Sequence, residues 1–154
     1  MIRYQEKDIL RIAKRINNSR RPYLLVNPLQ AKHIPVSPST ALQMMTSLGE
    51  LVAAKYGDAR LVIGFAETAT AIGAVVAKTI SDECLYIHTT REIVTDVKDY
   101  ILFTEEHSHA TEQKIVADNL NNFFSKTKTI ILVDDEFSTG KTLINMVNRL
   151  GACY

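Results

Sequence analysis

Short runs of apolar, β-forming residues alternate along this chain with longer segments whose apolar residues recur every three or four positions. Apolar runs bounded by polar or turn-forming residues are typical of buried strands, and the longer segments have the period of amphipathic helices. The predicted strands are residues 23–26, 61–65, 84–88 and 129–133, and the predicted helices are residues 6–17, 39–56, 68–80, 111–124 and 141–150. Residues 27–39 hold three of the four prolines and are predicted to be an extended connection, and residues 95–109 to be polar and irregular.

The same spacing predicts which side of each helix is buried. The inward positions are Ile9, Ala13 and Ile16 in the first helix; Leu42, Met45, Leu48 and Val52 in the second; Ile72, Val75, Val76 and Ile80 in the third; and Ile115, Val116, Leu120 and Phe123 in the fourth. Ser37 or Ser39 is expected to cap the second helix, because a hydroxyl can accept a hydrogen bond from an amide of the first turn. The strand at 129–133 is the most apolar, so we expect it to be the most central.

This alternation of strands and helices predicts an α/β fold. Continuous apolar strands are typical of a parallel sheet buried on both faces, and the helices between them supply the covering layers. We therefore expect three layers, with a mainly parallel sheet between helices. In such sheets ligands collect at the carboxyl ends of the strands, and the polar clusters discussed below follow predicted strand ends.

The composition is that of an ordinary globular domain. The 154 residues suit one domain, and 46% are hydrophobic and 23% charged. A net charge of +1 gives no sign of a nucleic-acid or membrane surface. Cys84 and Cys153 lie far apart and form no metal or redox motif. With no signal peptide and no apolar run long enough to cross a bilayer, we expect a cytoplasmic protein.

Residues 130–142, IILVDDEFSTGKT, carry the most specific chemistry in the chain. Four apolar residues run into two adjacent carboxylates, Asp134 and Asp135, and a Ser/Thr/Gly turn then leads into a helix. The carboxylates can accept hydrogen bonds from ribose hydroxyls, and the amides from Ser138 to Thr142 can hold a phosphate at the helix N-terminus. The segment therefore predicts a site for a sugar phosphate.

Two other interpretations of this segment exist. Gly140-Lys141-Thr142 matches the end of the nucleoside-triphosphate P-loop, but that motif needs a glycine five residues before Gly140, where this chain has Asp135. A carboxylate at that position would repel a triphosphate. The other interpretation is a buried strand followed by a polar turn and a helix cap, although two adjacent acids at the end of a buried strand are costly unless something uses them.

Two further polar segments follow predicted strands. In residues 64–70, GFAETAT, glycine and small residues let backbone amides approach a ligand and the threonines add hydroxyls; the alternative is that Thr68 only caps the next helix. In residues 89–92, TTRE, the guanidinium fork of Arg91 fits a pyrophosphate, and the alternative is a solvated arginine paired with Glu92.

Histidines and carboxylates cluster in residues 105–109, EEHSH. Two imidazoles and two carboxylates suggest a transition-metal site, but no third His or Cys has metal-site spacing. The alternative is a catalytic loop in which His107 or His109 handles a proton. Lys32 and His33 lie in the proline-rich connection, where their spacing alone favours a plain linker with a solvated Lys-His pair.

Taken together, these segments resemble the type I phosphoribosyltransferases. The order of strand, acid pair, loop and helix is similar to the loop of that family that binds phosphoribosyl pyrophosphate. AKHIPVSPS, GFAETATAIG, HTTRE, EEHSHATE and LVDDEFSTGKT occur in one order over residues 21–150, and are similar to the orotate-phosphoribosyltransferase-like proteins of bacterial tellurite-resistance and related stress operons. The resemblance implies the fold of that family for a single domain over residues 1–154, with an N-terminal helix and hood segment at 1–38 and the core at 39–154.

The activity implied by the resemblance is phosphoribosyl transfer from phosphoribosyl pyrophosphate to an acceptor, with release of pyrophosphate. Asp134 and Asp135 would hold the ribose 2- and 3-hydroxyls, and Arg91 would counter the charge of the pyrophosphate. The 5-phosphate would bind Ser138, Thr139, Gly140, Lys141 and Thr142, and the pyrophosphate would bind Glu67, Thr68, Ala69 and Thr70. Magnesium would bind through ligand oxygens and waters rather than directly to the protein.

The resemblance also implies roles for the remaining polar residues. Related enzymes carry a flexible loop near His107 and His109 that closes over the reacting centre, so that either imidazole could donate to the departing pyrophosphate or handle the proton of the acceptor. Lys32 and His33 would lie on the acceptor side, in the hood over a small-molecule acceptor. Because similar enzymes are commonly dimers, a homodimer is expected.

The C-terminus departs from the pattern of the family. The chain stops at Tyr154, just after the helix that follows the phosphate loop, whereas the family continues with at least one more strand. We therefore expect either a truncated domain or a partner that supplies the missing part. This leaves a second hypothesis, a non-catalytic sensor of a phosphoribosyl ligand or an assembly subunit. A third hypothesis is a metal-dependent hydrolase that uses His107 and His109.

Overall fold

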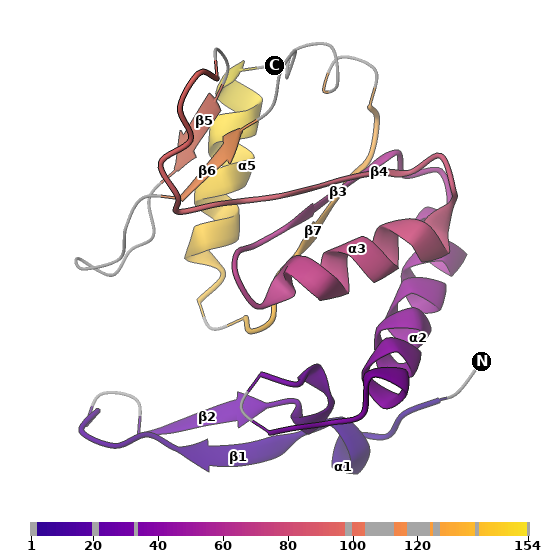
Figure 1. Ribbon diagram of the computed structural model, residues 1–154, viewed down its shortest axis with the longest axis vertical. Coiled ribbons are helices and arrows are strands. Elements are labelled where there is room, and N and C mark those ends of the chain that lie inside the picture. The colour runs from indigo at the N-terminus through magenta and orange to yellow at the C-terminus, as the bar shows by residue number, and fades with distance from the viewer. Residues whose placement is uncertain are drawn as a thin grey trace.

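Three parallel strands form the sheet at the centre of the structure (Figure 1). The computed structural model describes residues 3–19, 22–32, 34–97, 100–103, 113–116, 124, 127–137 and 139–153. The strands are β3 (Leu61–Gly64), β4 (Leu85–His88) and β7 (Ile130–Val133), in the order β4-β3-β7. Gly64 at the end of β3 pairs with His88 on one side and with Val133 on the other. The three strands therefore end at the same level, and the polar segments that follow them emerge at one edge of the sheet.

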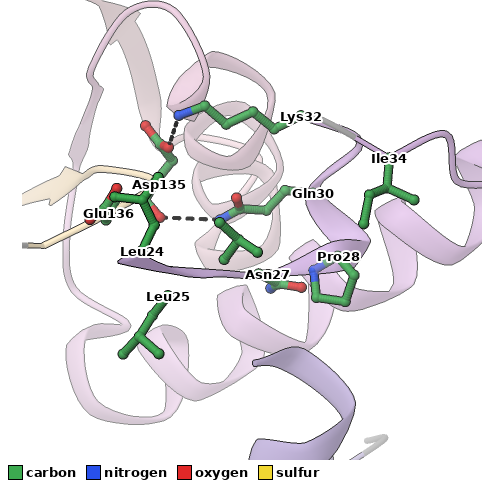
Figure 2. Close-up of a pocket in the computed structure, with 10 residues that line it drawn as sticks. Leu24, Leu25, Asn27, Pro28, Gln30, Lys32, Ile34, Asp135 and Glu136 are labelled. Carbon is green, nitrogen blue, oxygen red and sulfur yellow. Dashed lines mark hydrogen bonds and ion pairs between the residues drawn. The ribbon is translucent and has the colours of Figure 1, made fainter. Parts of the chain in front are cut away.

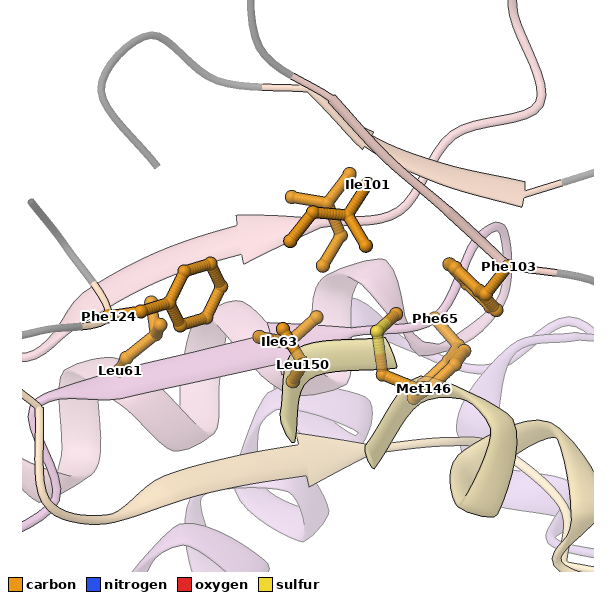
Figure 3. Close-up of a cluster of buried hydrophobic side chains, with 9 residues drawn as sticks. Leu61, Ile63, Phe65, Ile101, Phe103, Phe124, Met146 and Leu150 are labelled. Carbon is orange, nitrogen blue, oxygen red and sulfur yellow. The ribbon is translucent and has the colours of Figure 1, made fainter. Parts of the chain in front are cut away.

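Helices cover both faces of this sheet, because alternate residues of β3 point to opposite sides. The covering helices are α2 (Pro38–Tyr56), α3 (Ala69–Ile80) and α5 (Lys141–Cys153). Leu61 and Ile63 belong to one buried cluster with residues of α5 (Figure 3). Val62 belongs to a second cluster, which residues of α2 and α3 complete. The three-layer α/β architecture predicted from the sequence is confirmed.

The central strand of the described sheet is β3. All four of its residues are buried, whereas three of the four residues of β7 are only half-buried. The prediction that the strand at 129–133 would be the most central is therefore wrong. Apolar content does not distinguish a central strand from an edge strand here. Although β7 lies at the edge of the described sheet, its residues Ile131 and Leu132 each pack against one of the two core clusters.

An antiparallel hairpin lies on the α5 side of the sheet (Figure 1). It consists of β5 (Tyr100–Phe103) and β6 (Gln113–Val116). Ile101, Phe103 and Ile115 belong to the cluster that α5 and β3 share (Figure 3 shows the first two). The Phe103 and Phe65 rings pack in a T-shaped arrangement with 5.7 Å between the ring centroids, so the hairpin contacts the residue that follows β3.

This hairpin corrects two predictions from the sequence. An irregular segment was expected at 95–109 and a helix at 111–124, and both expectations are wrong where β5 and β6 lie. The side chains of β6 alternate between buried and half-buried, which is the two-residue period of a strand. Partners distant in sequence decide its conformation, and the local spacing of apolar residues does not reveal them. Leu120 and Phe123, also predicted to face inward, lie outside the described residues.

The N-terminal region forms a short helix and a hairpin rather than one helix over residues 6–17. Its elements are α1 (Glu6–Ile9), β1 (Arg11–Lys14), β2 (Tyr23–Val26) and the 3-10 turn η1 (Pro28–Gln30). Helix α1 ends at Leu10, which has an extended backbone, and Asn17 has a left-handed backbone with φ 59°, so a helix cannot pass through either residue. Ile16, which was predicted to face inward, is 86% exposed. The strand predicted at 23–26 is confirmed.

Helix α2 begins where the sequence predicts, because Ser37 accepts a hydrogen bond from the amide at the third helical position. Its buried face is nevertheless shifted from the predicted one, since Leu42 and Leu48 are exposed. Small residues make the contact with α3: a Cβ added to Gly49 would come within 2.6 Å of the Cβ of Thr79. This close approach of the two helices leaves the larger leucines at the surface.

Candidate active site

Asp134 and Asp135 follow the last residue of β7 at the edge where the parallel strands end. The amide of Asp135 donates to Oδ1 of Asp134 at 2.8 Å. The pKa of Asp134 is raised to about 6, chiefly by burial and also by the negative charge of Asp135, against a lowering by that hydrogen bond and by Lys32. Asp134 therefore changes charge near neutral pH, at the position that the sequence singles out.

A cation from the N-terminal region occupies the neighbouring carboxylate. Lys32 forms an ion pair with Oδ2 of Asp135, and Gln30 donates from Nε2 to the Asp135 carbonyl at 3.3 Å (Figure 2). The Asp135 side chain is only 16% exposed, so this pair is partly desolvated. The predicted acceptor-side residue Lys32 is thus brought to the acid pair. His33 lies outside the described residues.

The two segments enclose a small pocket, shown in Figure 2. It is lined by Leu24, Leu25, Val26, Asn27, Pro28, Gln30, Lys32, Ile34, Asp135 and Glu136, and we call it the hood pocket. Its cavity volume is ≈ 30 Å³, which is room for about one water molecule. An organic ligand that occupies the hood pocket itself therefore needs the N-terminal region to move away from Asp135.

The turn between the acid pair and α5 contains a glycine in a conformation that other residues rarely adopt. Gly140 has a left-handed backbone with φ 72°, and α5 begins at the next residue. The Gly140 carbonyl accepts from the Ile144 amide at 3.0 Å, and Thr139 Oγ1 accepts from the Lys141 amide at 3.4 Å. Thr139, Gly140, Lys141 and Thr142 thus lie at a helix N-terminus, as the sequence predicts; Ser138 lies outside the described residues.

The turn after β3 lies beside this edge of β7. The Phe65 amide donates to the Val133 carbonyl at 2.9 Å, which joins the first residue after β3 to the last residue of β7. The Ala66–Glu67 peptide that follows is cis. Thr68 occupies the N-cap position of α3, but its side chain makes no cap hydrogen bond. Two of the predicted ligand-binding segments are therefore neighbours in space.

The four residues predicted to line a pyrophosphate differ in exposure. Ala69 is fully buried and its amide donates to the Phe65 carbonyl at 3.2 Å, so neither its side chain nor its amide is open to a ligand in this conformation. Thr68 and Thr70 are half-buried, and the carboxylate of Glu67 is largely exposed. Arg91 approaches Glu67, with 3.8 Å between its Nη1 and Oε1 of the glutamate. The structure therefore brings Arg91 to the turn at residues 67–70.

Tyr86 of β4 also contacts the turn at residues 67–70, and this residue was not identified from the sequence. Its hydroxyl donates to the Thr70 carbonyl at 2.6 Å. Its side chain fills the space above two glycines: a Cβ on Gly64 would come within 2.8 Å of the tyrosine oxygen, and a Cβ on Gly73 within 2.8 Å of its ring. Burial raises the pKa of Tyr86 to about 12, so the hydroxyl remains a donor at neutral pH. The two glycines in GFAETATAIG, Gly64 and Gly73, were the feature of the sequence that could have indicated a large side chain packed against this segment.

Thr89 and Gln113 also contact this turn and were likewise missed. Both are buried, with 0% and 1% of their surface exposed. Thr89 follows β4 and lies in the segment HTTRE that drew attention to Arg91, whereas Gln113 belongs to β6 and was assigned to a helix. Gln113 stands between Glu112 and Lys114, so its place in the sequence gave no signal that it would be buried.

Metal-binding groups and membrane spans were sought in the described ranges. No three His, Cys, Asp or Glu side chains there come close enough to hold a metal ion. His107 and His109, the centre of the metal alternative and of the catalytic-loop prediction, lie outside those ranges. Of the helices within them, none is long and apolar enough to cross a membrane.

Fold and edge together define an α/β protein whose acid pair, glycine turn and basic residue meet at the carboxyl ends of parallel strands. The family model described as phosphoribosyl transferase matches residues 9–154, and the chain therefore belongs to that family. No curated protein matches the sequence.

Two solved structures share the fold. A crystal structure of adenine phosphoribosyl transferase from Trypanosoma brucei, in complex with AMP, pyrophosphate and ribose-5-phosphate, has a TM-score of 0.64 at 15% sequence identity, over 94% of this chain and 59% of that chain. Adenine phosphoribosyltransferase from Leishmania tarentolae has a TM-score of 0.60 at 16% identity, over 92% of this chain and 63% of that chain. This chain therefore spans about three fifths of the length of these two proteins.

Proposed function

We propose that this protein transfers a phosphoribosyl group from phosphoribosyl pyrophosphate to a small-molecule acceptor and releases pyrophosphate. The observation that carries the proposal is the place of Asp134 and Asp135: they lie at the end of β7, directly before the Gly140 turn into α5, and the turn after β3 is bonded alongside. Membership of the phosphoribosyl transferase family and the shared fold support the same activity.

Each part of the edge suits one part of the substrate. The two carboxylates would accept hydrogen bonds from the ribose 2- and 3-hydroxyls, and the amides of residues 138–142 would hold the 5-phosphate. The turn at residues 67–70 and the Arg91 guanidinium would take the pyrophosphate. As pyrophosphate leaves, the sugar carbon becomes cationic and negative charge grows on the leaving group, and Arg91 and the amides stabilise that charge.

Magnesium fits this donor set, which is made of oxygen. The ion prefers oxygen ligands and keeps several of its waters, and it would supply charge neutralisation of the pyrophosphate. We propose that it binds chiefly to substrate oxygens, with Asp134 and Asp135 within reach of its shell. Ionisation of Asp134, with its pKa of about 6, would then favour the occupied site.

The acceptor would enter on the side of the N-terminal region. We propose that residues 1–38 form the hood and residues 39–154 the core of a single domain, with Lys32 and His33 on the acceptor side. His107 or His109 would handle a proton of the acceptor or of the pyrophosphate. The tellurite-resistance subgroup and the homodimer implied by the sequence resemblance stay predictions.

Calorimetric titration of phosphoribosyl pyrophosphate with magnesium tests the proposal. We expect saturable binding to the wild-type protein and its loss in a variant that carries both Asp134→Asn and Asp135→Asn, since amides keep the shape of the carboxylates but lose their charge. Asp82→Asn is the matched control, because Asp82 is 89% exposed and pairs with Lys78 on α3. Binding that is absent from the wild type, or unchanged in the double variant, would refute the proposal.

A second function is favoured by the ion pair between Lys32 and Asp135. Lys32 pairs with Asp135, a residue predicted to bind ribose, and the hood pocket beside this pair has a volume of only ≈ 30 Å³. Such a site is suited to sense a ligand, because binding would break the ion pair. The second candidate is therefore a non-catalytic phosphoribosyl-ligand sensor or assembly subunit. Measurement of pyrophosphate release with a panel of nucleobases and other nucleophiles separates the two: sustained, acceptor-dependent release supports the transferase and excludes the sensor.

A further inference from the structure

Ala66, the residue before the predicted pyrophosphate-binding segment, is held through both of its backbone polar groups. Its amide donates to Oγ1 of Thr89 at 2.7 Å, and its carbonyl accepts from Nε2 of Gln113 at 3.4 Å. The Thr89 hydroxyl in turn donates to Oε1 of Gln113. These three hydrogen bonds form a closed ring through one peptide segment and two side chains.

Both side chains of the ring are buried, so the loss of a hydrogen bond between them or to Ala66 is costly. Thr89 is 0% and Gln113 is 1% exposed. A buried polar group that loses its partner keeps the full cost of its desolvation, whereas a solvated group can turn to water. The Thr89 hydroxyl acts here as acceptor and donor at once, so no aliphatic side chain of the same shape can replace it.

The two side chains come from elements that are themselves joined. Thr90, next to Thr89, exchanges two backbone hydrogen bonds with Lys114, next to Gln113, at 2.8 and 2.9 Å. This isolated bridge fixes the β5–β6 hairpin to the end of β4. Thr89 and Gln113 are therefore presented to Ala66 by a rigid support.

We propose that Thr89 and Gln113 are positioning residues that hold the turn at residues 66–68 in the conformation that receives pyrophosphate. The inference rests on the proposed function, because that function assigns pyrophosphate to this turn. Neither side chain is offered to the ligand, since both are buried and bonded to Ala66. Their effect is on the affinity for pyrophosphate, with no direct effect on the sugar-phosphate half of the site at Asp134 and Gly140.

The test uses a matched pair of variants at one position. Thr89→Val keeps the shape of the side chain and removes the hydroxyl, whereas Thr89→Ser keeps the hydroxyl. We expect Thr89→Val to raise the Kd of magnesium pyrophosphate about tenfold or more, the scale of one unsatisfied buried group. The Kd of ribose 5-phosphate should stay within about twofold, and Thr89→Ser should restore pyrophosphate binding to near the wild-type value.

A second variant and a second readout make the outcome decisive. Gln113→Met should reproduce the selective loss if Thr89→Val does not fold. Hydrogen exchange of residues 65–70 in the ligand-free protein should be faster in both variants than in the wild type. The inference is overturned if Thr89→Val raises the Kd of both ligands equally, or if it binds pyrophosphate with the wild-type Kd.

Failure of the proposed function has a different signature. A wild-type protein that binds no pyrophosphate contradicts the transferase, whatever the variants do. Faster exchange in Thr89→Val and normal exchange in Thr89→Ser would in that case still confirm that the hydroxyl holds the turn. Unchanged exchange in Thr89→Val would contradict the holding role itself.

Discussion

Lys32 forms an ion pair with Asp135, and 103 residues separate the two in sequence. The pair joins the N-terminal region to the acid pair at the end of β7 (Figure 2). It has two consequences for the proposed site. Asp135 is engaged before any ligand arrives, and the hood pocket has a cavity volume of only ≈ 30 Å³. A ribose hydroxyl that uses Oδ2 of Asp135 therefore competes with Lys32.

Replacement of Lys32 should tighten sugar-phosphate binding. In Lys32→Met the Asp135 carboxylate has no cation to release, so we expect the Kd of ribose 5-phosphate to fall by a few-fold, on the order of the 0.2–1 kcal/mol measured for exposed ion pairs. Isothermal titration calorimetry measures the change. Lys78→Met is the control, because Lys78 also pairs with an aspartate, Asp82 at 3.0 Å, but on the exposed side of α3. Weaker binding by Lys32→Met, with Lys78→Met unchanged, would show that Lys32 holds the ligand rather than blocks it.

The left-handed backbone of Gly140 predicts a sharp difference between two glycines of similar surroundings. An added Cβ meets nothing within 4 Å at Gly140 or at Gly151, but Gly140 has φ 72° and Gly151 lies in helix α5. Gly140→Ala should destabilise the protein by about 1–2 kcal/mol and weaken ribose 5-phosphate binding. Gly151→Ala should be neutral or stabilise by up to about 1 kcal/mol. Urea unfolding measures both values, and equal effects of the two substitutions would contradict the geometry of the turn.

The raised pKa of Asp134 predicts how stability changes with pH. The folded protein holds this proton up to pH about 6, whereas the ordinary value is 3.8, so the folded state binds more protons between these values. The free energy of unfolding should therefore fall as pH rises through this window. Asp134→Asn removes the effect and keeps the acceptor for the Asp135 amide, so its stability relative to wild type should rise by about 1–2 kcal/mol between pH 4 and 7, after allowance for solvent screening.

Urea unfolding at several pH values checks this, with Asp82→Asn as the exposed control. A difference between Asp134→Asn and wild type that does not change with pH would rule out the titration of Asp134. The same ionisation should strengthen ribose 5-phosphate binding as pH rises through about 6. The phosphate of the ligand titrates in that range as well. Only the part of the pH dependence that Asp134→Asn abolishes belongs to the protein.

Arg91 should contribute to pyrophosphate affinity and hardly at all to ribose 5-phosphate affinity. Arg91→Gln removes the guanidinium that lies 3.8 Å from Glu67, at the turn assigned to pyrophosphate. We expect the Kd of magnesium pyrophosphate to rise roughly tenfold to a hundredfold, as for loss of a charge-assisted contact. Arg60→Gln is the control. The Arg60 guanidinium pairs with Glu83 at a distance of 3.3 Å, and this pair is remote from the edge that carries the candidate site. Pyrophosphate binding that is equal in the two variants would remove Arg91 from the site.

The parts of the structure with a local signal were predictable from the sequence. A turn at a strand end is predicted by residue types alone where an apolar strand leads into Asp134 and Asp135 and a glycine precedes α5. The hydroxyl of Ser37 marks the start of α2 in the same way. The parallel order of the strands then brings the predicted segments to one edge, where the candidate site was expected.

The parts that depend on distant partners were not predictable. Gln113 was assigned to a helix because its apolar neighbours have helical spacing, whereas pairing with β5 makes its segment a strand. Tyr86 and Thr89 hydrogen-bond to the turn after β3, and Lys32 pairs with Asp135. Each of these contacts joins segments that are distant in sequence, and no local pattern predicts that they lie side by side. The buried face of α2 was misplaced for a related reason, because contact with Thr79 selects small residues over leucines.

A crystal structure with ribose 5-phosphate and magnesium tests the central claim most directly. We expect the 2- and 3-hydroxyls within hydrogen-bond distance of Asp134 and Asp135, the phosphate at the amides that surround Gly140, and Lys32 displaced from Asp135. A sugar phosphate bound away from β7, or Lys32 still paired with Asp135 beside an occupied phosphate turn, would contradict the account.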